Sequence, residues 1–392
     1  GEEDSSSSAP KAAAPGLKIA DGTRPFLCCG KETCGLVFQN EADDESGIYF
    51  RTLDAGLVPK SKPQPLTHKG STGSWPACFA REDGSFLVLY EEPAEEDASS
   101  YAAVRLHRMI VSSSGDVTGR VSRVVSIMEG LNEVAPSYTT AKIEDGVVLV
   151  WNTYSLSEDP SNIADLFDMG TRVIFLDMDG KEKGLVLKIN STAVALPSLI
   201  ACSKDRCLLA WTSLLGNGMG FNEMISVIST SGKIIEKGRM AFSGNPQRRK
   251  RSLVPAGSGT MLLWVDENML GKTVEMAAVI DWEGRVTADP QQVKPFGMDL
   301  PWSDFTWHAA ASPDGKSVFA AHSLPNEASG NDEVLALKLS SDGKVKEKYT
   351  VAFPDKRIEA CNVFSAAGGR PAVIYEVESD DGLPELYAVL LK

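Results

Sequence analysis

Arginine, tryptophan and histidine residues gather in short segments that recur along the chain and could together form a binding site. An arginine guanidinium forks onto the two oxygens of a carboxylate, and an indole stacks on a flat apolar surface such as one face of a sugar ring. The alternative is that these side chains pack as structural wedges or pair with nearby acids. The predicted ligand-binding residues are Arg24, His68, Trp75, Arg248, Arg249, Arg251, Trp302, Trp307, His308 and Arg357.

A second set of segments is strongly acidic, in a chain whose formal net charge is -14. Acids concentrated in one region would attract a cationic partner. They could also hold calcium, although the alternating Asp spacing typical of calcium loops is absent, so we predict no cofactor and leave calcium open. The other reading is a device for solubility. The predicted partner-binding residues are Asp43, Asp44, Glu45, Glu95, Glu96, Asp97, Glu378, Asp380 and Asp381.

Catalytic patterns are missing from the sequence. The four histidines show no spacing typical of zinc ligands, and neither a G-x-S-x-G elbow nor a phosphate-binding glycine-rich loop occurs. Paired carboxylates are abundant, but with so many acids any pair could be chosen. We therefore predict no catalytic residue and no metal site, and we expect the protein not to be an enzyme.

The segments must be positioned by strands, because short apolar runs that end in an aromatic residue recur every fifty to sixty residues. The runs read CGLVF, SFLVLY, GVVLVW, CLLAW, TMLLW and PAVIY, and KSVFAAHS is a degenerate seventh that lacks the aromatic. Each run predicts a buried strand. Because Trp151, Trp211 and Trp264 recur at the repeat period, we expect them to fill space between repeats.

A second strand, a glycine-containing turn and a further strand follow most of the runs. Small polar residues before glycine favour the positive φ that a tight β-hairpin needs. The predicted turn glycines are Gly56, Gly115, Gly180, Gly232, Gly284 and Gly343. The seventh unit, ELYAVLLK, lacks the outer strand, and GLKI at 16–19 copies the start of the outer strand elsewhere.

This pattern resembles a seven-bladed β-propeller, with repeats similar to exported bacterial propellers and distantly to sialidase-like and TolB-like repeats. The implied fold is all-β, with four-stranded blades and a ring that is closed when an N-terminal strand completes the C-terminal blade. The predicted blades 1 to 6 are 24–70, 75–130, 131–192, 193–245, 246–304 and 305–354. Blade 7 is 355–392 with 16–20 as its outer strand, and 1–15 is a disordered tether.

In such a propeller, with strands A to D counted from the centre outward, the B-to-C loops and the D-to-A connections open on one face, where propellers usually bind. The acidic segments are the B-to-C loops, and the basic and aromatic segments are the D-to-A connections. We therefore expect an acidic rim around a basic and aromatic central mouth.

Two C-x4-C patterns predict disulfides across hairpins, Cys29–Cys34 and Cys202–Cys207, unless these cysteines stay reduced. In this scheme Cys28, Cys78 and Cys361 are unpaired, although a Cys28–Cys361 bridge across the ring closure is conceivable. Disulfides favour an oxidising compartment, and no apolar run is long enough to span a membrane. We expect an exported chain, in the periplasm or on the cell surface, with the N-terminal segment as a tether.

The function predicted from these features is a non-enzymatic, exported binding or assembly module that uses the loop-rich face. The alternative is a carbohydrate-active propeller, a glycosidase or lectin, with the central arginines and tryptophans as its site. The expected partner is a protein or a glycan. Nucleic acid is not expected, because phosphate binding needs clustered lysine and arginine on a basic surface. We expect a monomer.

Overall fold

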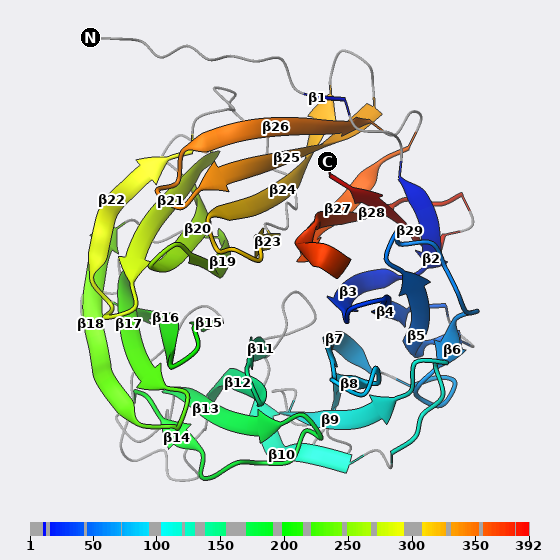
Figure 1. The fold of residues 1–392 in the computed structure, drawn as a ribbon, viewed down its shortest axis with the longest axis horizontal. Coiled ribbons are helices and arrows are strands. Elements are labelled where there is room, and N and C mark those ends of the chain that lie inside the picture. The colour runs from blue at the N-terminus through cyan, green and yellow to red at the C-terminus, as the bar shows by residue number, and fades with distance from the viewer. Residues whose placement is uncertain are drawn as a thin grey trace, which may run out of the picture.

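The computed structural model of the 392-residue chain is a ring of seven β-sheets around a central axis (Figure 1). The structure describes residues 11–12, 16–42, 45–71, 73–93, 103–119, 122–129, 138–153, 170–190, 198–214, 221–244, 249–267, 273–293, 308–326, 331–352, 356–380 and 382–391. The predicted all-β, seven-bladed propeller is confirmed.

Each blade is an antiparallel sheet whose first strand lies innermost. Blade 1 consists of β3 (Thr23–Cys29), β4 (Thr33–Asn40), β5 (Gly47–Asp54) and β6 (Gln64–Pro65). Blade 2 consists of β7 (Ser74–Ala80), β8 (Phe86–Pro93), β9 (Ala103–Val111) and β10 (Ser122–Glu129). Blade 3 consists of β11 (Tyr138–Ile143), β12 (Gly146–Thr153), β13 (Gly170–Asp177) and β14 (Leu187–Lys188).

The remaining blades repeat this order. Blade 4 consists of β15 (Leu199–Cys202), β16 (Arg206–Leu214), β17 (Phe221–Ser229) and β18 (Ile234–Gly244). Blade 5 consists of β19 (Arg249–Ala256), β20 (Gly259–Glu267), β21 (Thr273–Asp281) and β22 (Val286–Gln292). Blade 6 consists of β23 (His308–Ala311), β24 (Ser317–Asn326), β25 (Asn331–Ser340) and β26 (Val345–Ala352), and blade 7 begins with β27 (Ile358–Ser365), β28 (Pro371–Val377) and β29 (Glu385–Leu390).

The ring closes through β2 (Leu17–Asp21), which pairs antiparallel with β29 and becomes the outer strand of blade 7. Gly16 N–H donates to Tyr375 Oη at 3.0 Å, and Lys18 Nζ lies 2.7 Å from Glu385 Oε1. The predicted closure by an N-terminal strand is therefore confirmed. In addition, β1 (Lys11–Ala12) runs parallel to β26 at the outer edge of blade 6.

The core lies between neighbouring blades. The aromatic residues that end the apolar runs of the second strands are almost fully buried, with Trp151, Trp211 and Trp264 exposed by 4%, 4% and 1%. One cluster joins Val148 of blade 3 to Leu209 of blade 4, so each blade covers the apolar face of the next. Trp151 and Trp264 lie in clusters that join two blades, as predicted.

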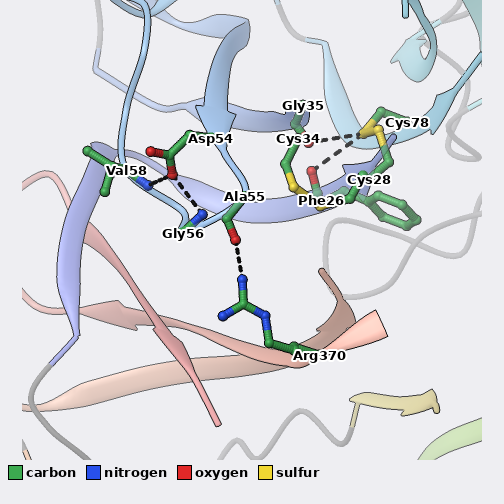
Figure 2. Close-up of a disulfide and its surroundings, with 11 residues drawn as sticks. Phe26, Cys28, Cys34, Gly35, Asp54, Ala55, Gly56, Val58, Cys78 and Arg370 are labelled. Carbon is green, nitrogen blue, oxygen red and sulfur yellow. Dashed lines mark hydrogen bonds between the residues drawn. A yellow bond between two sulfur atoms is a disulfide. The ribbon is translucent and has the colours of Figure 1, made fainter. Parts of the chain in front are cut away.

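Five of the six predicted turn glycines adopt a positive φ, between 73° at Gly180 and 96° at Gly115. The prediction for Gly56 is wrong, because the left-handed residue of the blade 1 turn is Leu57, with φ 67°. In this turn Asp54 Oδ1 accepts hydrogen bonds from the N–H groups of Gly56 and Val58, as Figure 2 shows. The aspartate fixes the turn, and the left-handed position falls one residue after the glycine.

Three disulfides cross-link strands of the propeller. Cys29–Cys34 and Cys202–Cys207 join the first two strands of blades 1 and 4 and confirm both predicted pairs. The third, Cys28–Cys78, joins the innermost strands of blades 1 and 2 (Figure 2). The prediction that Cys28 and Cys78 are unpaired is wrong, as is the Cys28–Cys361 alternative, because β3 lies beside β7 and brings these two sulfurs together. Cys361 is a buried cysteine outside the three disulfides.

On the face opposite the B-to-C loops, arginines in A-to-B turns reach the C-to-D turn of the next blade. Arg81 Nη2 lies 2.6 Å from Asp179 Oδ1, and Arg206 Nη1 lies 2.7 Å from Glu283 Oε1. Arg370 Nη2 donates to the Ala55 carbonyl at 2.6 Å across the ring closure (Figure 2). These contacts connect neighbouring blades, so the arginines on this face have a structural role.

Candidate binding site at the mouth of blades 7, 1 and 2

Arg24 and Trp75 occupy equivalent places in neighbouring blades, each at the start of an innermost strand and each followed by a proline. Both have a positive φ, 49° and 48°. A left-handed backbone is uncommon for residues other than glycine, and holding it costs about 1–3 kcal/mol per residue. The ladders of β3 with β4 and of β7 with β8 are irregular at these positions. Backbone strain of this kind clusters at functional sites.

The two side chains contact each other. The Arg24 guanidinium carbon lies 4.3 Å from the centre of the Trp75 ring, which is the geometry of a cation–π interaction. Arg24 Nη1 also donates to Gln39 Oε1 at 2.9 Å and lies 3.9 Å from Glu41 Oε1. The arginine is therefore held between an indole and polar groups of its own blade, with a quarter of its side chain exposed.

Glu376, at the end of β28, links this pair to blade 7. Its Oε1 accepts a hydrogen bond from Arg24 N–H at 3.0 Å, although the residue is only 6% exposed. Burial raises the pKa of Glu376 to about 7, against the opposing effect of the Arg24 N–H. The nearby carboxylates of Glu359 and Glu41 add to the rise in pKa. Arg24 thus contacts both Glu376 of blade 7 and Trp75 of blade 2.

Blade 3 supports the other side of Trp75. Tyr138 Oη donates to the Trp75 carbonyl at 2.7 Å. Burial, and to a lesser extent the charge of Glu91, raises the pKa of Tyr138 well above its ordinary value. Glu91, on β8, lies opposite Ser74 of β7 and is 2% exposed. The strained backbone at Trp75 is therefore fixed from the neighbouring blade.

Of the ten predicted ligand-binding residues, the structure brings Arg24 and Trp75 into contact. Arg251 forms a buried ion pair with Glu223 of blade 4, so it is a structural residue of the blade 4–blade 5 boundary. His68 and Arg357 are exposed, and the Arg357 carbonyl accepts a hydrogen bond from Glu378 N–H at 3.0 Å. Arg249 and His308 begin β19 and β23, but their side chains lie outside the described residues, as do Arg248, Trp302 and Trp307.

Three residues of the predicted acidic rim are described. Glu45 Oε1 forms an ion pair with Lys69 Nζ at 2.9 Å, and Glu378 and Asp380 are exposed. Asp43, Asp44, Glu95, Glu96, Asp97 and Asp381 lie outside the described residues. The rim therefore stays a prediction, supported by exposed acids in blades 1 and 7.

The sequence reading missed the buried acids. Glu91 and Glu376 are both buried near the ends of strands. Glu275 on β21 is a further example, and burial raises its pKa to about 8. The position next to the buried aromatic in each second strand, as in Tyr90–Glu91 and Tyr375–Glu376, was the available signal.

The described residues contain no group of three or more histidine, cysteine, aspartate or glutamate side chains placed to hold a metal ion.

No protein-family profile and no curated protein matches the chain. Solved structures do. The WD40 domain of coronin from Toxoplasma gondii aligns with a TM-score of 0.53 and 8% identity, covering 96% of this chain and 85% of that domain. The propeller domain of the Trilobed protease from Pyrococcus furiosus aligns at 0.52 and 12%, covering 95% and 94%. The NanB sialidase from Streptococcus pneumoniae aligns at 0.44 and 11%, covering 96% and 70%. The two alignments with TM-scores above 0.5 show the propeller fold.

Proposed function

We propose that the protein is an exported binding module that holds a cationic protein partner on its loop-rich face, in the sector formed by blades 7, 1 and 2. The observation that carries the proposal is the Arg24–Trp75 pair, in which two left-handed residues from two blades meet at 4.3 Å. A fold keeps such strain where a defined surface is needed.

The charge of this sector favours a cationic partner. Acidic residues outnumber basic ones among the described residues at this end of blades 7, 1 and 2. The acids are Asp21, Glu41, Glu45, Glu91, Glu92, Glu359, Glu376, Glu378, Asp380 and Glu385, and the bases are Lys18, Arg24, His68, Lys69, Arg105, His107, Lys356 and Arg357. Complementary charge speeds encounter and rejects partners of the wrong sign.

Export is supported by the three disulfides, since such bonds persist in oxidising compartments. The helices in the described part of the chain include none that is long and apolar enough to cross a membrane.

The carbohydrate alternative has less support at this site. A sugar would stack on an indole face, but the Arg24 guanidinium covers one face of Trp75. Trp302 and Trp307, the other candidates for stacking, lie outside the described residues.

The test is capture of a partner from an extract of the protein's own source, at low and at high ionic strength, by the immobilised chain. Arg24→Gly and Trp75→Gly are suitable variants because glycine accepts the left-handed backbone. Arg206→Ala, on the opposite face, is the matched control. We expect a partner that is lost at high ionic strength and with either glycine variant, but kept by the control. Capture that is indifferent to salt or to both glycine variants would refute the proposal.

A further inference from the structure

Asn362 is buried in β27, the innermost strand of blade 7, with 6% of the residue exposed. Its Oδ1 has no hydrogen-bond partner among the residues that the structure describes. Buried polar groups in folded proteins are nearly always hydrogen-bonded, so a buried amide without a partner calls for an explanation.

The side chain faces blade 1. Asn362 lies opposite Ile374 and Ala360 lies opposite Glu376 in the β27–β28 ladder, so Asn362 and Glu376 share a face of the sheet. Phe364 follows Asn362 on that same face, and its ring lies 5.4 Å from the ring of Phe26 on β3. Asn362 is therefore bracketed by two contacts with β3, the Glu376–Arg24 hydrogen bond on one side and the Phe364–Phe26 contact on the other.

Two residues of β3 between those contacts, Arg24 and Pro25, offer Asn362 no free backbone donor. Arg24 N–H already donates to Glu376, and Pro25 has no N–H. The bulge in the β3–β4 ladder falls at the same residues. The sequence of β3 thus leaves two acceptors, the Glu376 carboxylate and Asn362 Oδ1, on one side of the blade 7–blade 1 boundary.

Asn222 Oδ1 on β17 is also buried without a partner among the described residues, but the blade 3–blade 4 boundary differs. There Asn152 Oδ1 accepts from Thr171 Oγ1 at 3.2 Å and from Ser198 Oγ at 2.8 Å. Asn190 Oδ1 accepts from Thr171 N–H at 3.0 Å. The buried asparagines at that boundary are satisfied by the chain itself, whereas Asn362 is not.

We propose that the blade 7–blade 1 boundary holds a primary ammonium group of the partner, from a lysine side chain or a chain N-terminus, between the Glu376 carboxylate and Asn362 Oδ1. An ammonium group is compact and has three N–H donors and no acceptor, which matches a site that offers acceptors. This inference rests on the proposed function, because it names the group by which a cationic partner is held.

The charged groups acting on Glu376 are Arg24 and Glu41 of blade 1 and Glu359 of blade 7. The two carboxylates favour a bound cation and Arg24 opposes it. Because burial raises the pKa of Glu376 to about 7, protons compete with the ammonium group at neutral pH. Binding should strengthen as the pH rises from 6 to 8.

The experiment titrates the purified chain at pH 8 with lysine blocked by an acetyl group and an amide, with the equally blocked norleucine as the uncharged control. We expect the lysine compound to bind and the norleucine compound not to bind. Glu376→Gln and Asn362→Leu should each weaken binding about tenfold or more, because each removes a buried acceptor. Glu359→Gln, an exposed acid nearby, should weaken it by less than about threefold.

Stability separates a binding role of Asn362 from a structural one. If its amide serves a ligand, Asn362→Leu should raise the thermal midpoint of the free chain while weakening the binding of the lysine compound. A lower midpoint with unchanged binding would overturn the proposal, as would equal binding of both compounds or none by the wild type. Asn362→Ala serves if leucine prevents folding. If the wild type does not bind the lysine compound but still captures a partner in a way that depends on salt and on Arg24, this inference is refuted and the proposed function stands.

Discussion

Cys28 and Cys78 are joined by a disulfide between the innermost strands of blades 1 and 2, with Cα atoms 5.7 Å apart. The same two strands carry Arg24 and Trp75 at their starts. The covalent bond therefore sets how closely the two halves of the candidate site lie.

Replacing both Cys28 and Cys78 by alanine should lower the free energy of unfolding by about 4 kcal/mol, because the bond closes a long loop in the unfolded chain. The sequence separation is 50 residues, against 5 for Cys29–Cys34. The matched Cys29→Ala and Cys34→Ala double variant should lose only about 2 kcal/mol. Denaturant titration under oxidising conditions measures both losses. Equal losses would show that loop length does not govern the stabilisation.

Arg251→Met should destabilise the fold by about 3–5 kcal/mol, because it removes one member of a buried ion pair. The double variant Arg251→Met, Glu223→Leu should recover most of that loss, since an apolar pair can replace a buried ion pair. Denaturant midpoints of the single and double variants test this. A single variant as stable as the wild type would contradict the structural role assigned to Arg251.

Glu376→Gln should stabilise the protein at high pH. The pKa of Glu376 is raised from its ordinary value of 4.5 to about 7 in the folded state, so the unfolded state loses this proton first as the pH rises. The wild type is therefore progressively destabilised between pH 4.5 and 7, by up to about 3 kcal/mol, and the penalty stays constant above that. Thermal unfolding of both proteins at pH 4 and pH 8 checks this. The variant should gain at pH 8 only, and a gain of equal size at pH 4 would contradict it.

Gly16→Val should weaken the ring closure. A Cβ at this position would lie 2.6 Å from Tyr375 Oη and 2.9 Å from the Ala388 carbonyl oxygen, so β2 would have to shift. We expect a loss of about 1–3 kcal/mol. Leu17→Ala, at a side chain that is 47% exposed, should change stability by less than about 0.5 kcal/mol. Similar effects of the two substitutions on thermal unfolding would argue against a tight closure.

The repeats made the architecture readable from sequence. Trp264 and its counterparts mark the buried strands, and GLKI near the N-terminus supplies the outer strand that ELYAVLLK lacks. Hairpin disulfides could be predicted because their cysteines are local. Cys28–Cys78 could not be read from one spacing, since it depends on two innermost strands lying side by side.

The site was only partly predictable. Arg24 and Trp75 were assigned to the mouth by residue type and by their place before an innermost strand. Their left-handed backbone depends on tertiary contacts, among them the hydrogen bonds of Glu376 and Tyr138. The burial of Glu376 was missed because acids at strand ends ordinarily face solvent. Leu57 shows the same limit, since neighbouring residues decide which position of a turn is left-handed.

The pairing of β2 with β29 also governs the order of events during biosynthesis. A ribosome delivers residues 17–21 first, yet their antiparallel partners at 385–390 emerge only after six other blades have been made. Residues 17–21 therefore lack the strand that they pair with until synthesis is nearly complete, and an unpaired strand is prone to aggregation. Blade 7 is thus the last to assemble, and it contains Glu376, on which the Arg24 backbone depends. The chain acquires its candidate binding surface only on completion of the ring.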